Sequence, residues 1–200
     1  MPDLIDRTFF QQLAAMPAEE VCSRTGCTCD DREGAYAITL WDRRYRVLPH
    51  LQLVCPADPA TPPLHPYLEL FLVHYLLRAD GVAPCGRWLS EKDLPGGATF
   101  FRGPHAIPGE LITARFSNDI EAFNRRCRQL QGSPLDLADS AWRFAITPRM
   151  PVAVLYWQGD DLFPAEAKLL FDAAIGSCLA ADVVYALAVG VCERLGGEGD

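Results

Sequence analysis

Two adjacent aspartates, Asp160 and Asp161, follow a long apolar run and form a Gly-Asp-Asp turn. Paired carboxylates at the end of a strand are suited to binding a hard cation or to general acid–base catalysis. One of them can instead cap the helix that we expect next, because aspartate accepts hydrogen bonds from the first amides of a helix. The cap or turn is the favoured interpretation since it requires no other residue, and the two chemical roles are the alternatives.

Arg149, Trp157 and His105 are the other candidates for binding a ligand. Arg149 and Trp157 flank the apolar run that ends at the acidic turn, and His105 lies in a loop beside aromatic and basic residues. Such residues contact ligands or anions when a rigid scaffold positions them, although a plain surface loop is the default interpretation for His105. Arg149 either forms a structural ion pair with Asp172 or lines a pocket with it, and the sequence leaves both open.

Three of the eight cysteines are close enough in sequence to share a metal ion: Cys22, Cys27 and Cys29. Structural zinc sites use closely spaced thiolates, and iron–sulfur sites use three or four cysteines in a tight loop. Cys27 and Cys29 would point to opposite sides of a strand, so a shared ion requires a turn, which Gly26 permits. Free thiols in or near the core are the alternative. No motif indicates a particular cofactor.

Composition and charge argue against several classes of protein. Of the 200 residues, 50% are hydrophobic and 22% are charged, as in a globular protein. The net charge of −8 disfavours a nucleic-acid partner, because phosphate contacts need a basic patch. The N-terminus lacks the apolar segment of a secretory signal, so we expect a cytoplasmic protein with reduced thiols. Residues 173–192 are apolar but interrupted by Asp182, which predicts two packed helices and no membrane span.

The first 80 residues predict a helix, a hairpin and a second helix. Residues 6–16 carry apolar side chains at helical spacing. Residues 34–48 alternate around Asp42-Arg43, which predicts a β-hairpin with its turn at that pair, and an extended segment follows. The proline-rich loop 56–66 then leads to a nearly all-apolar helix, which must be buried on most sides.

The middle of the chain predicts loops and a further helix. Residues 83–105 are rich in glycine and proline, so we expect loops around one short strand. Asn118 and Glu121 match a capping box, and the apolar residues that follow lie on one helical stripe that ends at Gly132. This segment therefore predicts an amphipathic helix capped by Asn118.

The last third of the chain predicts two strands and two helices. Residues 142–146 and 152–157 are apolar runs, and the second is continuous, as expected of an interior strand. After the acidic turn, the spacing of Ala167, Leu170 and Phe171 predicts a helix. A final apolar helix is predicted to stop at the last pair of glycines.

Together these elements predict a single α+β domain over residues 1–200, with a mainly antiparallel sheet packed by about four to five helices. The sheet combines the N-terminal hairpin with the two strands of the last third. Residues 196–200 are expected to be a disordered tail.

Several motifs give the chain a resemblance to a known family. They are Pro148-Arg149-Met150-Pro151, Trp157-Gln158-Gly159-Asp160-Asp161, Phe163-Pro164 and Leu170-Phe171-Asp172. This pattern resembles the prokaryotic family called domain of unknown function 3786. The resemblance implies an origin in anaerobic bacteria or archaea and an association, in some members, with a four-cysteine iron–sulfur module. This chain lacks that module, because its cysteines form no C-x-x-C series.

Two classes of function follow. The resemblance implies an accessory or binding protein that works with a protein partner in anaerobic redox, iron–sulfur or corrinoid metabolism. The residues themselves leave open a small hydrolase-like or metal-dependent enzyme that uses Asp160, Asp161 and His105 around one pocket. The two classes differ in geometry, since the enzyme requires these side chains to converge and the binding protein does not.

Overall fold

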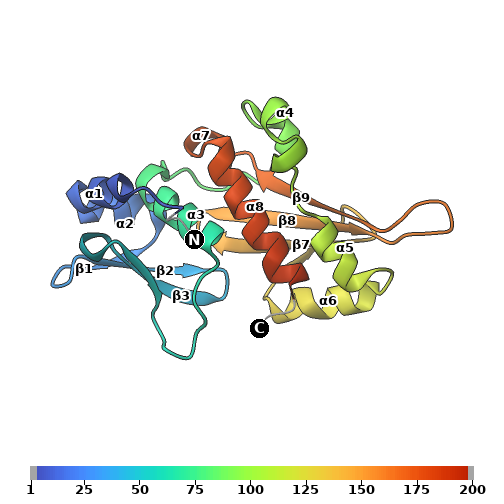
Figure 1. The fold of residues 1–200 in the computed structure, drawn as a ribbon, viewed down its shortest axis with the longest axis horizontal. Coiled ribbons are helices and arrows are strands. Elements are labelled where there is room, and N and C mark those ends of the chain that lie inside the picture. Colours follow the sequence, from blue (N-terminus) through green and yellow to red (C-terminus); the bar gives the residue numbers. More distant parts are fainter. Residues whose placement is uncertain (1–3, 198–200) are drawn as a thin grey trace.

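The computed structural model describes residues 4–197 and contains two antiparallel sheets (Figure 1). The first sheet has the order β1-β2-β3-β4 and consists of β1 (Thr28–Asp30), β2 (Ala35–Leu40), β3 (Arg43–Leu48) and β4 (Leu53–Pro56). The second has the order β5-β9-β8-β7-β6 and consists of β5 (Trp88–Leu89), β6 (Ser133–Leu135), β7 (Ser140–Thr147), β8 (Met150–Trp157) and β9 (Glu166–Asp172). The predicted α+β class is confirmed, with two sheets in place of one.

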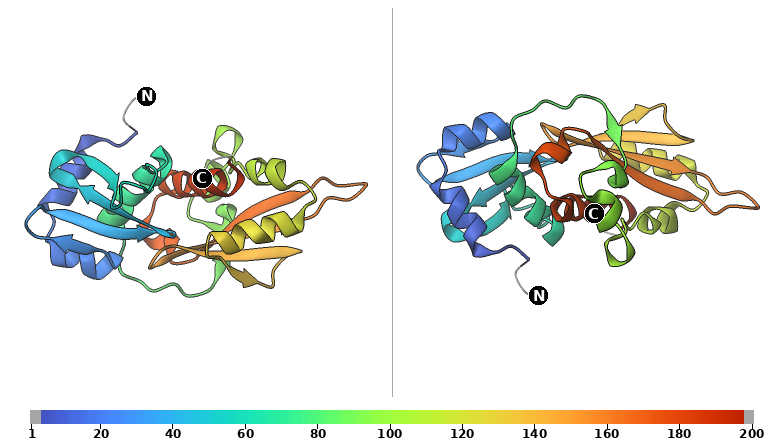
Figure 2. Two further views of the ribbon diagram at one scale, coloured as in Figure 1. Left: turned by 90° about the horizontal axis from the view of Figure 1, so that it is seen from below. Right: turned by 90° about the horizontal axis from the view of Figure 1, so that it is seen from above.

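Eight α-helices lie within the described residues, more than the four or five predicted. They are α1 (Arg7–Ala15), α2 (Ala18–Thr25), α3 (Pro66–Arg78), α4 (Gly97–Phe100), α5 (Glu110–Phe116), α6 (Ile120–Gln129), α7 (Ile175–Cys178) and α8 (Ala181–Gly196). Figure 2 shows the first sheet with α1 and α2 at one end of the molecule, the second sheet at the other, and α3 and α8 near the middle. Within residues 4–197, no helix is long and apolar enough to cross a membrane.

The β2–β3 hairpin forms where the alternating sequence predicted it, but its turn is one residue earlier. Trp41 and Asp42 make the turn, and Arg43 is already the first residue of β3. Trp41 adopts a left-handed backbone conformation with φ of 61°, which is uncommon for a bulky residue. The surrounding contacts explain this conformation, because Trp41 is the residue through which the two sheets meet.

The two sheets are connected directly at Trp41. Its backbone amide donates a hydrogen bond to the carbonyl of Ile146 in β7, at 2.6 Å. Its indole Nε1 donates to the carbonyl of Leu130 after α6, at 2.8 Å, and its ring packs against Phe144. Side chains of both sheets consequently belong to one hydrophobic core.

Helices α3 and α8 pack against each other in that core, as their all-round apolar sequences predicted. Gly190 in α8 is the point of closest approach, since a Cβ there would lie 2.3 Å from Cγ of Leu68 in α3. The two glycines predicted to stop α8 are its last residue and its cap. Residues 196 and 197, which were expected to belong to a disordered tail, thus complete the helix end, and residues 198–200 lie outside the described residues.

The predicted helix after the acidic turn is wrong, because the segment forms strand β9. Six residues of β9 pair with β8, in register from Trp157↔Glu166 to Val152↔Phe171. Strand β8 is interior, as predicted, so both of its edges must find hydrogen-bond partners. β7 satisfies one edge and β9 the other, and this pairing outweighs the helical spacing of the apolar residues.

A second boundary also differs from its prediction. Asp119 caps α6, and its Oδ1 accepts a hydrogen bond from the amide of Ala122 at 2.8 Å. Asn118, the predicted cap, instead accepts a hydrogen bond at Oδ1 from the amide of Gly159, at 2.9 Å. A contact with the β8–β9 hairpin has thus replaced the local one.

Candidate functional site

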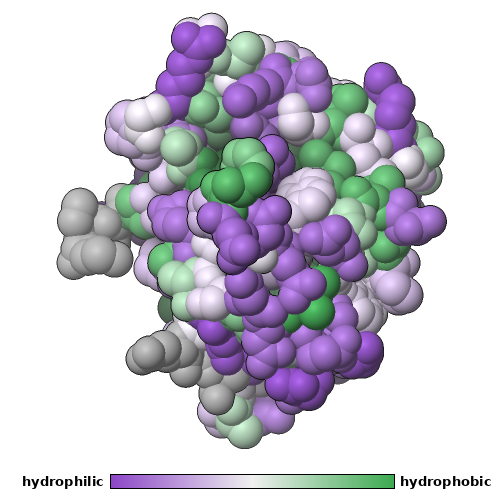
Figure 3. All heavy atoms as spheres, turned by 90° about the vertical axis from the view of Figure 1, so that its right-hand side faces the viewer, coloured by the Kyte–Doolittle hydropathy of each residue, from purple (hydrophilic) through white to green (hydrophobic). Residues whose placement is uncertain are grey.

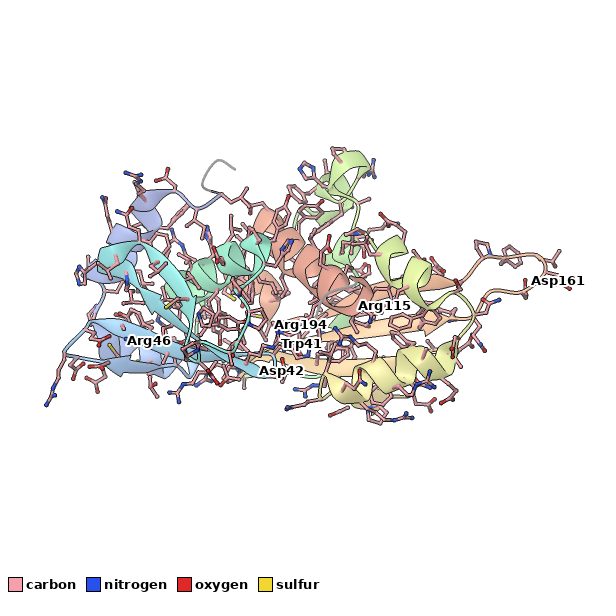
Figure 4. All side chains as sticks on the ribbon, turned by 60° about the horizontal axis from the view of Figure 1, so that its bottom comes forward. Trp41, Asp42, Arg46, Arg115, Asp161 and Arg194 are labelled. Carbon is pink, nitrogen blue, oxygen red and sulfur yellow. The ribbon has the colours of Figure 1, made fainter. Side chains whose placement is uncertain are left out.

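The acidic turn lies in the loop of the β8–β9 hairpin, which projects from one end of the molecule (Figure 1, Figure 4). Oδ1 of Asp160 accepts hydrogen bonds from the amides of Leu162 and Phe163, both at 2.8 Å. These two hydrogen bonds hold the pKa of Asp160 below its usual value. Asp160 therefore shapes its own loop, and the helix that it was predicted to cap is absent.

The hairpin loop also exposes two large apolar side chains. Leu162 is 82% exposed and Phe163 is 70% exposed. Figure 3 views the molecule from the side to which the hairpin projects, and apolar groups stand there among hydrophilic residues. Asp161 lies at this far end in Figure 4, well away from the middle of the molecule.

Asp172, at the other end of β9, is fully buried and holds three backbone amides. Its carboxylate accepts hydrogen bonds from the amides of Gly86 at 2.7 Å, Ala174 at 3.0 Å and Cys85 at 3.1 Å. Burial raises the pKa of Asp172, but these hydrogen bonds outweigh it and hold the pKa below the usual value. Asp172 thus ties the loop before β5 to the end of β9.

The sequence left open either an ion pair with Asp172 or a shared pocket for Arg149, and in the structure Arg149 binds backbone carbonyls. Its guanidinium donates to the carbonyl of Gly81 at 2.8 Å and to the carbonyl of Ser23 at 3.0 Å. Both Arg149 and Asp172 therefore bind backbone groups of separate segments. Each anchors a loop, which is a structural role.

His105 and Trp157 make contacts of their own with residues other than the aspartates. His105 stacks on Phe100 with ring centroids 4.5 Å apart and meets Tyr185 of α8 edge-on at 5.6 Å. Trp157, at the end of β8, faces the ammonium group of Lys168 at 5.5 Å. The residues predicted to bind a ligand thus contact different neighbours: His105 packs in an aromatic cluster, whereas Asp160 bonds to amides of its own loop.

The cysteine cluster is close together in space as well as in sequence. The sulfur atoms of Cys22 and Cys27 are 3.5 Å apart, and Cys29 follows at the start of the first sheet. Across residues 4–197, no group of three or more His, Cys, Asp or Glu side chains is arranged to hold a metal ion. The metal site predicted at these three thiols therefore gains no support from their arrangement.

A pocket of about 290 Å³ opens where the first sheet meets α3 and α8. It brings together residues of β3, the proline-rich loop and both helices. The lining residues are Arg43, Tyr45, Pro62, Pro63, Leu64, His65, Leu68, Gly190, Glu193, Arg194 and Gly197. Its size is at the lower end of the range for small-molecule sites.

The pocket has an apolar wall and a charged rim of both signs. Pro62, Leu64 and Leu68 supply apolar surface, while Arg43 and Arg194 supply two guanidinium groups and Glu193 one carboxylate. Such a lining suits a small molecule with an apolar body and a single acidic group, because the guanidinium fork binds a carboxylate in two places. Glu193 disfavours a more highly charged anion, since its carboxylate would repel it.

Arg194 is held rigidly at this site. Its guanidinium is 2.6 Å from Oδ1 of Asp42, with side chains only 9% and 18% exposed, and its Cζ lies 5.2 Å from the ring centroid of Trp41. Figure 4 shows Arg194, Trp41 and Asp42 together in the middle of the molecule. The hairpin turn thus positions a cationic side chain of α8 at the edge of the pocket.

Tyr45, in β3, also lines the pocket, and its side chain is almost fully buried. Burial raises the pKa of its hydroxyl, and the positive charges of Arg194 and Arg43 offset part of this effect. The hydroxyl therefore stays protonated near neutral pH and is able to donate a hydrogen bond. This gives the pocket a neutral donor next to its two guanidinium groups.

Sequence reasoning missed the pocket residues. Arg43 was assigned to a turn, and the segment that contains Arg194 was interpreted only as an apolar helix. One signal was available, since the proline-rich loop 56–66 precedes a buried helix and such a loop covers the edge of a core. Nothing in the spacing, however, connects residue 43 with residue 194.

Comparison with known proteins gives a family and no nearer relative. The chain matches the family described as domain of unknown function (DUF3786) over residues 17–194. It therefore belongs to this family, as the motifs in its last third indicated. No curated protein and no solved structure matches it.

Proposed function

We propose that this protein is a non-catalytic binding protein whose pocket accepts a small monocarboxylate with an apolar body. The observation that carries the proposal is that Arg43 and Arg194 line one pocket together with an apolar wall. A hydrolase-like or metal-dependent enzyme is the weaker alternative. Its three groups, Asp160, Asp161 and His105, lie on a hairpin loop and on a separate aromatic cluster, and Asp160 bonds to backbone amides.

The broader setting of this binding role comes from the family resemblance. An accessory protein of anaerobic redox, iron–sulfur or corrinoid metabolism, in the cytoplasm and with a protein partner, is the context that we propose. Many acids of intermediary metabolism combine one carboxylate with a short apolar chain, so the pocket's chemistry is compatible with this context.

The strength of binding that the pocket can supply is modest. A hydrogen bond to a charged group contributes about 1.5–3 kcal/mol, so losing one arginine contact should cost at least roughly tenfold in affinity. The apolar wall adds about 25 cal/mol for each Å² that the ligand buries. A monocarboxylate should therefore bind measurably better than the neutral amide of the same shape.

The experiment is a ligand series with two matched variants. Thermal denaturation and calorimetric titration compare aliphatic and aromatic monocarboxylates with their amides and with inorganic phosphate. Arg43→Gln should lower carboxylate affinity at least about tenfold, because it removes one charged partner. Arg46→Gln is the control: Arg46 is in the same strand but pairs with Glu33 outside the pocket.

The outcomes separate the alternatives clearly. Equal effects of both variants would show binding to surface charge alone and would contradict the proposal. Absence of any carboxylate binding by the unmodified protein would contradict it as well. Preference for phosphate over the monocarboxylates would refute the assigned ligand class.

A further inference from the structure

Three thiols gather at one corner of the molecule, separate from the pocket. Cys22 is in the last turn of α2, Cys27 follows the helix cap, and Cys29 is in β1. The thiol of Cys27 donates a weak hydrogen bond to the sulfur of Cys22, at 3.5 Å. Cys27 is almost fully buried, whereas Cys22 and Cys29 are half-buried.

The corner that carries the two close sulfurs is firmly anchored. Gly26 adopts φ of +75°, donates its amide to the carbonyl of Cys22 at 2.9 Å, and has Pro148 against it. The hydroxyl of Tyr75 donates to the carbonyl of Thr25 at 2.8 Å. These contacts hold the backbone between Cys22 and Cys27, where the two sulfurs lie 3.5 Å apart.

We propose that Cys22 and Cys27 form a dithiol exchange site that reacts with low-molecular-weight disulfides. A disulfide requires the sulfurs at about 2.05 Å, so they must approach by roughly 1.5 Å, which side-chain rotation supplies. The rest of the corner keeps its hydrogen bonds. The pair therefore reacts as a unit, unlike the exposed Cys85.

The chemical step is a balanced thiol–disulfide exchange. The thiolate of Cys22 attacks one sulfur of the small disulfide, forms a mixed disulfide and releases one small thiolate. The thiolate of Cys27 then attacks the sulfur of Cys22 and releases the second. The two cysteines are oxidised by two electrons, the small disulfide is reduced to two thiols, and the two cysteine protons end on those thiols.

Exposure assigns the order of the two attacks. Cys22 is accessible, so it meets the small disulfide first. Burial is the main cause that raises the pKa of Cys27 to about 12, and the neighbouring thiols Cys22 and Cys29 raise it further. Cys27 is therefore a poor first nucleophile, and it acts on the mixed disulfide that forms 3.5 Å away.

The test uses the fully reduced, unmodified protein and glutathione disulfide. After incubation, free thiols are alkylated, the chain is cut with trypsin, and the peptides are analysed by tandem mass spectrometry. Trypsin cuts after Arg24 and Arg32, so Cys22 is on one peptide and Cys27 and Cys29 are on the next. The expected product is these two peptides joined covalently, with fragmentation at Thr28 locating the link on Cys27.

Two variants and one internal reference complete the experiment. Cys22→Ser should lose the linked pair, and Cys29→Ser should keep it. Cys85 is exposed, and its thiol donates to the carboxylate of Asp172, so it should at most take up glutathione as a mixed disulfide. A stable glutathione adduct on Cys22 without the internal link would overturn the proposal, and so would a dominant link from Cys22 to Cys29. The carboxylate assays are unaffected by either result.

Discussion

The β8–β9 hairpin loop and the pocket between β3 and α8 satisfy their charged side chains in opposite ways. In the loop, Asp160 bonds to amides two and three residues along the chain. In the pocket, Arg194 pairs with Asp42, which is 152 residues away in sequence. A local partner uses the charge to shape a turn, whereas a distant partner fixes a charged side chain of α8 beside the pocket. A conspicuous acidic motif is therefore a weaker indicator of a site than residues assembled from several elements.

The largest effect should come from Asp172, which is buried and, unlike Asp160, accepts hydrogen bonds from amides of a distant segment. Asp172→Ala leaves three backbone amides without their acceptor in a buried place, which we expect to cost about 4 kcal/mol of unfolding free energy. Chemical denaturation measures it. A loss under about 1 kcal/mol would mean that water replaces the carboxylate. Asp172 would then matter no more to stability than Asp160 in the hairpin loop.

The same carboxylate should give the protein an acid-sensitive stability. The pKa of Asp172 is lowered in the folded protein, so its contribution is fully present above the unfolded pKa of about 3.9 and is lost as pH falls through the folded value. The difference in unfolding free energy between the unmodified protein and Asp172→Asn should be constant near neutral pH and shrink below about pH 4. Denaturation curves across this range check it, and a constant difference down to the lowest pH would contradict the assignment.

An intermediate effect is expected at the edge of the pocket. Asp42→Ala removes the carboxylate partner of the largely buried Arg194 and loosens the link between the hairpin turn and α8. We expect a loss of about 2 kcal/mol, less than for a fully buried pair because Asp42 keeps some contact with solvent. Thermal denaturation gives the stability, and the carboxylate titration should weaken in parallel. An unchanged titration would show that Arg194 needs no positioning.

A smaller effect should follow from adding a methyl group where α3 and α8 approach each other most closely. Gly190→Ala places a methyl group against Leu68, so we expect overpacking to cost about 1.5 kcal/mol. Leu68 also lines the pocket, and its displacement should lower the affinity for bulky carboxylates more than that for acetate. A ligand-size series measures this difference. Equal losses for all sizes would place the effect outside the apolar wall.

The smallest effect should come from the hairpin loop. Asp160→Ala removes an acceptor that serves only its own exposed turn, so the loss of stability should be well below that of Asp172→Ala, with carboxylate affinity unchanged. Leu162→Ser should change the unfolding free energy by no more than about 0.5 kcal/mol. Any loss of carboxylate binding in these variants would connect the loop with the pocket and remove the contrast between the two regions.

Much of the secondary structure was predictable because it depends on local patterns. The alternation before Trp41 specified the hairpin, the continuous apolar run specified β8 as an interior strand, and the all-round apolar segments specified α3 and α8. The helical spacing around Leu170 was misleading, since Leu169 and Phe171 face the core from a strand. In that segment the open edge of β8 outweighed the local pattern.

The candidate site was less predictable, because its residues also find their partners in distant parts of the chain. The motifs around Arg149 and Asp172 were visible in the sequence, but their partners are backbone groups of distant loops. Only the cysteine cluster was both predicted and found together, because its members are close along the chain.

The sequence by itself determined the family, the antiparallel α+β class and most element types, because these depend on residue type and spacing over a few turns or strands. The tertiary structure decided that there are two sheets joined at Trp41, that β9 is a strand, and that Arg43 and Arg194 share a pocket. Each of these outcomes depends on which distant groups satisfy one another's hydrogen bonds and charges. That information is absent from local spacing.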